Sequence, residues 1–269
     1  GISQPAFSAR IKNLELDLGA PVVLRGNRFI GFTPEGEIAL KWAQRMIADA
    51  RGLQQEVDSA RGALSGWLTI GAVPTALSFV AAIAAELRSA HPALTPRVLS
   101  QSSSEIAKGL EAFSLDLGVT YQESALPNAS KVQPAYVERY EVLAPRNLVP
   151  GGRAKISWAE AAPIPLCLLP RNMMNRQIMD QAFLRAEAPP NVVMETNAFT
   201  AALVQVTSGI AATIAPEMLI DHTTLPDNVV RLKLTDPVIE KPIGFVAPER
   251  EPRLPAVDAI LATLKRHRR

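Results

Sequence analysis

One long, uninterrupted helical pattern constrains the fold of this sequence more than any other feature. Thr33-Pro34-Glu35-Gly36-Glu37 marks its start with an N-cap residue, a proline at the first helical position, and acids near the positive end of the helix dipole. A narrow apolar stripe then steps by threes and fours for about six or seven turns without a proline. Its members are Trp42, Met46, Ala50 or Asp49, Leu53, Val57, Ala60 and Leu64.

A helix this long cannot bury so narrow a stripe by itself. Two interpretations stay open at this stage. The stripe packs on the protein's own domain, or it pairs with the same helix of a second subunit. Pairing is the simpler solution for a seam of this length, so we interpret residues 34–65 as a linker and dimerisation helix.

The stretch before this helix predicts a shorter one with both ends marked. Ser3 is a good N-cap, Pro5 falls in the first turn, and Gly19 can adopt the left-handed conformation that ends a helix. Its apolar face consists of Phe7, Ile11, Leu14 and Leu18. The outward residues are hydrogen-bonding groups without a carboxylate, namely Gln4, Ser8, Arg10, Lys12 and Asn13. This composition suits a helix that meets phosphates and base edges in the DNA major groove, although an ordinary amphipathic surface helix would show the same spacing.

Two short β-like runs follow, at residues 22–25 and 29–32, around a Gly26-Asn27-Arg28 turn. This pattern predicts a hairpin that carries Arg25 and Arg28. We interpret the hairpin as a wing beside the helix.

Three segments in order, SQPAFSARIKNLE, LGAPVVLR and FTPEGE, resemble the winged helix-turn-helix signature of LysR-type transcriptional regulators. The resemblance implies that residues 1–33 are a partial DNA-binding domain, that the helix over residues 3–15 is the recognition helix, and that the helices normally preceding it are missing from this sequence. It also implies dimerisation through the linker helix. Val23 departs from the family, which usually has an aromatic residue there. The residues expected to contact DNA are Ser3, Gln4, Pro5, Ser8, Arg10, Lys12, Arg25 and Arg28.

Beyond a break in composition at residues 62–66, strand and helix patterns alternate twice, which indicates two α/β lobes with mostly parallel sheets. Expected strands span residues 67–73, 95–99, 115–121, 137–144, 164–169, 192–195, 211–214, 229–234 and 243–247. Expected helices span residues 79–90, 104–113, 175–187, 199–207 and 254–267. The segments GWLTIGAVPTA, LDLGVTY and VTSGIAATIAP match recurrent turns of the family. The resemblance implies a two-lobed effector-binding domain similar to type 2 periplasmic binding proteins, with lobe I at about residues 66–144 plus 246–269 and lobe II at about 145–245.

Ligands of open α/β sheets bind beyond the carboxyl ends of the strands, where loops and helix N-termini converge. That rule selects four segments, at residues 74–76, 100–104, 171–175 and 196–197. Their candidate effector-binding residues are Thr75, Ala76, Ser102, Ser103, Arg171, Asn172, Thr196 and Asn197. Hydroxyls, amides and one arginine together favour a small organic anion, in particular a carboxylate. The alternative for Thr75 and Ser102 is a purely local helix cap, and for Arg171 a solvated surface charge.

Composition excludes several classes of protein. Net charge is only +2, so any DNA affinity must come from local clustering. His91, His222 and His267 lack metal-ligand spacing, and no P-loop, GxGxxG or GxSxG occurs, so we expect no enzyme, metal or cofactor. Cys167 is the only cysteine and is predicted to be a buried strand thiol, which fits a reducing cytoplasm. No run approaches the ~18 apolar residues of a membrane span.

The resulting hypothesis is a cytoplasmic, homo-oligomeric transcriptional regulator. Its expected partners are promoter DNA, a small carboxylate effector, a second subunit in a homodimer, further subunits in a homotetramer, and RNA polymerase. The competing hypothesis is a small-molecule-binding module without DNA function, and an enzyme is a distant third.

Overall fold

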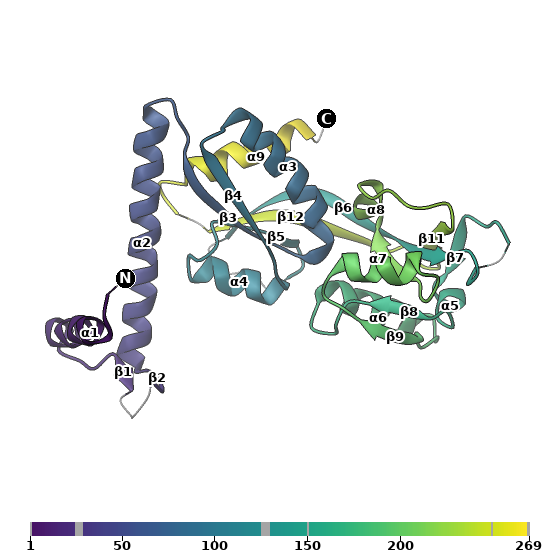
Figure 1. Cartoon of the computed structure of the whole chain (residues 1–269), viewed down its shortest axis with the longest axis horizontal. Coiled ribbons are helices and arrows are strands. Elements are labelled where there is room, and N and C mark those ends of the chain that lie inside the picture. Colours follow the sequence, from purple (N-terminus) through teal and green to yellow (C-terminus); the bar gives the residue numbers. More distant parts are fainter. Residues whose placement is uncertain (1, 25–28, 125–129, 150, 249, 268–269) are drawn as a thin grey trace.

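The computed structural model describes residues 2–24, 29–124, 130–149, 151–248 and 250–267. Three parts follow one another along the chain: a small N-terminal unit, a long helix, and a two-lobed α/β domain. Figure 1 shows the long helix standing beside the first lobe, with the N-terminal unit at its lower end and the second lobe on the far side. No helix within the described ranges is long and apolar enough to cross a bilayer.

The N-terminal unit begins with the predicted helix α1 (Gln4–Leu18). The Ser3 side chain accepts a hydrogen bond from the Ala6 amide at 3.4 Å, and Gly19 ends the helix with φ of 68°. Strands β1 (Val23–Leu24) and β2 (Gly31–Phe32) pair antiparallel, which confirms the predicted hairpin. Arg25 and Arg28 lie outside the described residues.

Helix α2 (Pro34–Ala60) starts where the sequence predicts, with the Thr33 hydroxyl accepting from the Gly36 amide at 3.0 Å. The first turn approaches the hairpin so closely that a Cβ on Gly36 would lie 1.9 Å from the Val22 carbonyl oxygen. The Glu15 carboxylate also accepts from the Val22 amide at 3.0 Å. Helix α1, the hairpin and the start of α2 therefore form one packed unit, in which position 36 must be glycine.

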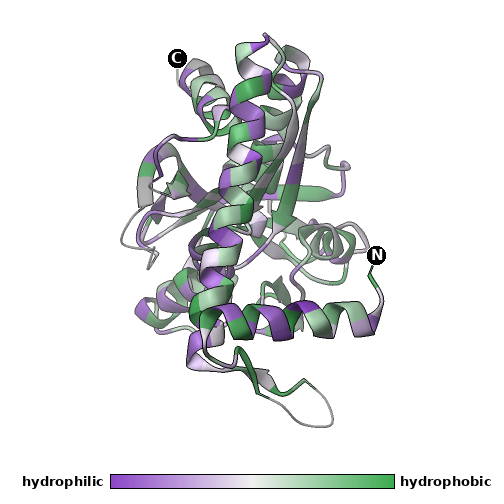
Figure 2. Cartoon of the chain, turned by 90° about the vertical axis from the view of Figure 1, so that its left-hand side faces the viewer, coloured by the Kyte–Doolittle hydropathy of each residue, from purple (hydrophilic) through white to green (hydrophobic). Residues whose placement is uncertain are grey.

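Two different faces of α2 have different environments. One face packs against lobe I through Ala48 and Gly52, and the Gln55 amide donates to the Trp67 carbonyl at 3.0 Å. Most of the predicted apolar stripe lies on another face and is exposed, with Trp42 56% and Leu53 65% exposed. The prediction was wrong for Leu64, because the helix ends at Ala60 and Leu64 is buried in the core. Figure 2 shows hydrophobic positions recurring along the outward side of this helix. Packing on the protein's own domain therefore does not cover the stripe.

Lobe I is a sheet in the order β4-β3-β5-β12-β6, where β3, β4 and β5 run parallel and β12 is antiparallel to both neighbours. Helices α3 and α4 pack against its strands, and α9 packs against α3. The bounds are β3 (Gly66–Ala72), η1 (Pro74–Ala76), α3 (Leu77–Ala90), β4 (Leu94–Ser100), α4 (Ser103–Glu111), β5 (Leu117–Tyr121), β6 (Ser130–Pro145), β12 (Glu240–Pro248) and α9 (Pro255–His267).

Lobe II is built on the second half of β6, which pairs antiparallel with β10 and with β11. Strand β11 also pairs with β7 in parallel. Separately, β8 pairs with β9 in parallel. The short elements β7, α5 and α8 were not predicted as separate elements, because so few residues carry no periodic signal. The bounds are β7 (Lys155–Ser157), α5 (Trp158–Ala161), β8 (Leu166–Leu168), α6 (Met174–Arg185), β9 (Val192–Glu195), α7 (Phe199–Thr207), β10 (Thr213–Pro216), α8 (Glu217–Asp221) and β11 (Val229–Thr235).

Strand β6 connects the lobes, and its pairing corrects the predicted boundary after residue 144. Up to Arg139 the strand pairs with β12 of lobe I, and from Tyr140 it pairs with β10 of lobe II. Strand β12 likewise joins lobe I from Glu240, ahead of the predicted residue 246. The sequence cannot mark this change, since one continuous strand has the same pattern on both sides of it.

Candidate functional site

The turn η1 lies at a small cleft between the two lobes. Thr75 contributes to its wall from lobe I, and the residues from lobe II are Leu168, Leu169, Asn175, Phe199, Ala202, Thr213 and Ile214. The lobes close tightly here, leaving an empty volume of only ≈ 240 Å³.

A buried carboxylate lies behind Thr75. The Tyr121 hydroxyl is 3.3 Å from the Thr75 hydroxyl and donates to Glu138 Oε2 at 2.9 Å. Tyr140 donates to the same oxygen at 2.9 Å, and Tyr136 donates to Oε1 at 3.4 Å. The chain contains three tyrosines, and all of them bind Glu138.

Strand geometry explains this cluster. Tyr136, Glu138 and Tyr140 alternate along β6, so their side chains share one face of the sheet, and Tyr121 is the last residue of β5. Burial raises the pKa of Glu138 to about 6, while hydrogen bonds from Thr75 and the tyrosines oppose the rise. Burial and the nearby Glu138 charge raise the pKa of Tyr121 well above its ordinary value, so Tyr121 remains a hydrogen-bond donor at neutral pH.

Two more polar side chains reach the cleft from lobe II. Asn175, 3% exposed near the start of α6, has an Nδ2 atom that is buried without a hydrogen-bond partner. The Thr213 hydroxyl donates to the Cys167 carbonyl at 2.7 Å. Neither residue was among the predicted effector-binding residues.

The predicted residues after β4 have local roles in the structure. The Ser102 hydroxyl accepts from the Glu105 amide at 3.3 Å, and the Ser102 amide donates to the Glu105 carboxylate at 2.8 Å, which is a capping box. The Ser103 hydroxyl accepts from Thr120 at 2.8 Å. Ala76 is fully buried in the core next to Thr75. The alternative interpretation of Ser102 as a helix cap therefore accounts for its contacts.

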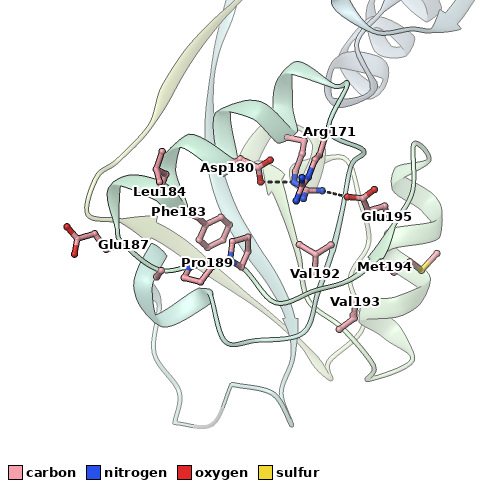
Figure 3. Close-up of a pocket in the computed structure, with 13 residues that line it drawn as sticks. Arg171, Asp180, Phe183, Leu184, Glu187, Pro189, Val192, Val193, Met194 and Glu195 are labelled. Atoms are coloured by element: carbon pink, nitrogen blue, oxygen red, sulfur yellow. Dashed lines mark hydrogen bonds and ion pairs between the residues drawn. The ribbon is translucent and has the colours of Figure 1, made fainter.

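Arg171 lines a different cavity, on the side of lobe II between α6 and β9 (Figure 3). The same cavity contains the buried Arg176, which donates to Asp180 at 2.8 Å and Glu195 at 2.7 Å. Thr196 accepts from the Ala198 amide at 3.1 Å, and Asn172 and Asn197 are exposed. None of the predicted Arg171, Asn172, Thr196 and Asn197 lines the cleft with Thr75. The first turn of α6 brings Asn175 there instead.

The sequence contained one pattern from which the buried Glu138 and its tyrosines could have been predicted. The alternation Tyr136-x-Glu138-x-Tyr140 puts a single acid between two aromatic residues on one face of a strand. A buried acid must be hydrogen-bonded, and tyrosines on the same face are donors within reach. Asn175 lies in the predicted segment 171–175, but nothing in the sequence distinguishes it there from Arg171 and Asn172. Thr213 carries no comparable signal, because its contribution depends on how lobe II faces lobe I.

The predicted DNA-contacting residues of α1 and its cap form an exposed polar surface, made of Ser3, Gln4, Pro5, Ser8, Arg10 and Lys12. Phe7 and Leu14 of the opposite face are also open, at 55% and 41% exposure. Cys167 is buried in β8 as predicted, and burial raises the pKa of its thiol. Over the described parts of the chain, no three His, Cys, Asp or Glu side chains are grouped to hold a metal ion.

Two family models together match nearly the whole chain. The LysR substrate binding domain matches residues 61–269, and the bacterial regulatory helix-turn-helix protein, lysR family, matches residues 1–37. The chain belongs to the LysR family. This LysR-type chain is thus a transcriptional regulator with a helix-turn-helix part and a substrate-binding domain, and its family members are regulators and not enzymes. LysR regulators bind promoter DNA and small-molecule effectors.

Individual relatives agree with this assignment. A probable hydrogen peroxide-inducible genes activator of Streptomyces viridosporus is 25% identical, over 98% of this chain and 86% of the relative. The regulator IlvY of Escherichia coli strain K12 is 22% identical, over 99% of this chain and 91% of the relative.

Solved structures show the same fold. A full-length OxyR variant from Pseudomonas aeruginosa has a TM-score of 0.78 at 20% identity, covering 98% of this chain and 86% of that one. Full-length CbnR in complex with its target DNA has a TM-score of 0.69 at 20% identity, covering 98% of this chain and 90% of that one.

Proposed function

We propose that this LysR-type regulator contacts promoter DNA through the polar face of α1 and the hairpin, responds to a small effector held between its lobes, and dimerises through the open stripe of α2. The observation that carries the proposal is that one chain has a separate structural feature for each of these three roles. A polar helix, an unpaired apolar stripe and a cleft with buried polar groups lie in three successive parts. A regulator of promoter DNA works where the chromosome is, so we place it in the cytoplasm.

The DNA-binding role is supported by the chemistry of α1. Gln4 and Ser8 offer side chains that hydrogen-bond base edges, and Arg10 and Lys12 offer charges for phosphates, all of them exposed. The test is fluorescence anisotropy with a labelled fragment of the gene's own promoter, using the protein expressed from its complete gene. Arg10→Ala should weaken binding and flatten its dependence on salt, because one phosphate contact is lost. Binding that is absent, or independent of salt, would refute the DNA-binding role and favour a module that only binds a small molecule.

Dimerisation is supported by the exposure of the α2 stripe. Trp42, Met46 and Leu53 are each more than half exposed on one chain, and an apolar stripe of this length is stabilised by a second helix. Assembly into a homotetramer and contact with RNA polymerase stay predictions of the resemblance, since no particular contact of the described residues supports them.

The effector site is supported by Thr75 and Asn175, which reach one cleft from different lobes. A ligand that binds both can therefore change how the lobes are held together. The carboxylate prediction rested mainly on hydroxyls beside helix N-termini, with Arg171 as an added counter-charge, and Arg171 lines another cavity. Thr75→Val should weaken effector binding by about ten-fold or more, as expected for the loss of a hydrogen bond worth roughly 1.5–3 kcal/mol.

A further inference from the structure

The direction of the hydrogen bonds behind Thr75 can be worked out from the groups involved. An ionised carboxylate only accepts, so Glu138 receives the single proton of the Tyr121 hydroxyl at 2.9 Å. With its proton committed, Tyr121 can only accept in its 3.3 Å contact with Thr75. The Thr75 hydroxyl therefore donates its proton away from the cleft, to Tyr121 or to Glu138 itself, and toward the cleft it presents lone pairs alone.

Thr213 is oriented in the same way on the opposite wall. Its hydroxyl lies 2.7 Å from the Cys167 carbonyl, which has no proton to give, so Thr213 must donate to it. Thr75 and Thr213 both line the cleft. The cleft thus offers two hydroxyl oxygens that can accept hydrogen bonds and have no proton left to donate.

Asn175 supplies the complementary group. Its Nδ2 donor is buried without a partner in the same cleft, so a ligand acceptor placed there would satisfy it. With the amide turned over, its oxygen would face the cleft and would also require a donor from the ligand. In the orientation shown, Asn175 needs an acceptor from the ligand, and in either orientation Thr75 and Thr213 need donors.

The negative charge of Glu138 behind the cleft also disfavours an anionic ligand. Glu138 is 1% exposed, and across the described ranges it makes no ion pair with a lysine or arginine. The groups that face it are Thr75 from η1, Tyr121 from β5, and Tyr136 and Tyr140 from β6. Its register partner on β12, Lys241, instead binds Glu123 at 2.6 Å. A carboxylate brought to Thr75 would meet oxygen lone pairs and, behind them, an uncompensated negative charge.

We propose that the effector of this regulator is an uncharged molecule that carries N–H or O–H donors beside a carbonyl acceptor, with the primary carboxamide as the simplest such group, and that carboxylates are discriminated against. The donors meet Thr75 and Thr213, and the carbonyl accepts from Asn175. This inference rests on the proposed function, which puts the effector in this cleft. It replaces the carboxylate expected from the sequence.

The test uses matched pairs of probes that differ only in this group: benzamide and benzoate, nicotinamide and nicotinate, butyramide and butyrate. Saturation-transfer NMR, which detects millimolar binding, is applied to the whole protein at a pH well above 6, where Glu138 is ionised. We expect the amide of at least one pair to bind about ten-fold or more tightly than its acid. Thr75→Val should abolish that binding and Thr75→Ser should keep it.

Glu138→Gln is the decisive variant. A glutamine amide can donate as well as accept, so the chain of hydrogen bonds through Tyr121 can reverse and let Thr75 donate into the cleft. We expect the preference for the amide to fall by about ten-fold in Glu138→Gln. The preference for the amide should stay unchanged in the control Glu240→Gln, because the Glu240 carboxylate is exposed and pairs with Arg139.

The outcomes separate the two proposals. Tighter binding of the acids, sensitive to Thr75→Val, would overturn the carboxamide inference and leave the effector site in place. An amide preference that Glu138→Gln does not change would also overturn the inference. Binding that Thr75→Val leaves intact, or no binding of any probe, would count against the cleft as the effector site, and the inference would fall with it.

Discussion

The buried carboxylate should make the stability of this protein depend on pH in a way that one substitution removes. Glu138 has an ordinary pKa of 4.5 and a pKa of about 6 in the folded protein, because burial disfavours its charge more than the hydroxyls favour it. A raised pKa in the folded state means that stability is fully present below pH 4.5 and is lost as the pH rises through about 6. At about 1.4 kcal/mol per pH unit, the loss amounts to about 2 kcal/mol.

The assay is urea unfolding of wild type and Glu138→Gln, followed by tryptophan fluorescence, at about pH 4 and about pH 8. Other groups titrate over this range in both proteins, so the informative quantity is the difference between the two free energies of unfolding. Between about pH 4 and about pH 8, the wild type should lose about 2 kcal/mol of unfolding free energy relative to Glu138→Gln. The matched control is Glu240→Gln on the neighbouring strand, whose carboxylate is half exposed.

Two results would refute this reasoning. A free-energy difference between wild type and Glu138→Gln that stays constant from about pH 4 to about pH 8 would mean that Glu138 ionises as easily in the folded protein as in the unfolded one. A shift of equal size in Glu240→Gln would mean that the effect belongs to carboxylates of this sheet in general and not to the tyrosine cluster.

Three further substitutions test other parts of the structure. Gly36→Ala should destabilise the N-terminal unit by about 1–3 kcal/mol or more and weaken DNA binding, because the added Cβ would collide with the hairpin backbone. Gly31→Ala, where a Cβ has room, should be tolerated. Thermal unfolding measures the stability of both variants, and fluorescence anisotropy measures their DNA binding. Leu53→Glu should give monomers in analytical ultracentrifugation, whereas Val204→Glu, equally exposed on lobe II, should not. Arg176→Met should cost about 1–3 kcal/mol in urea unfolding, because the Leu169 carbonyl, Asp180 and Glu195 lose a buried donor while both carboxylates keep contact with water.

The fold could be predicted largely from the sequence because its strongest patterns are local. Caps at Ser3 and Thr33 and the stop at Gly19 mark two helices, and each cap makes the predicted hydrogen bond to the backbone. Apolar runs mark most strands of both lobes. The residue at which β6 changes its pairing partner, Tyr140, could not be predicted, because pairing partners are not encoded in the strand's own alternation.

The candidate site was only partly predictable for a related reason. Thr75 follows from the rule that ligands bind beyond the carboxyl ends of strands, and it does reach the cleft. Arg171 was selected by the same rule and lines another cavity, because the rule identifies a loop without saying which of its residues faces inward. The contacts of Thr75 with Tyr121 and of Tyr121 with Glu138 join residues distant in sequence, so the proposed acceptor role of Thr75 could not be read from the sequence.

Strand β5 relates the tyrosine cluster to the helix that carries the DNA-binding unit. Tyr121 ends this strand beside Glu138, and Asp116 precedes its first residue, accepting from the Thr69 amide at 2.8 Å. Asp116 also lies 3.9 Å from the Arg51 guanidinium of α2. Thr75 of the cleft therefore contacts the last residue of one short strand that is buried along its whole length, and the linker helix contacts the residue just before the first. Because a packed strand moves as a unit, a ligand that repositions Thr75 and Tyr121 acts on an element that α2 also contacts.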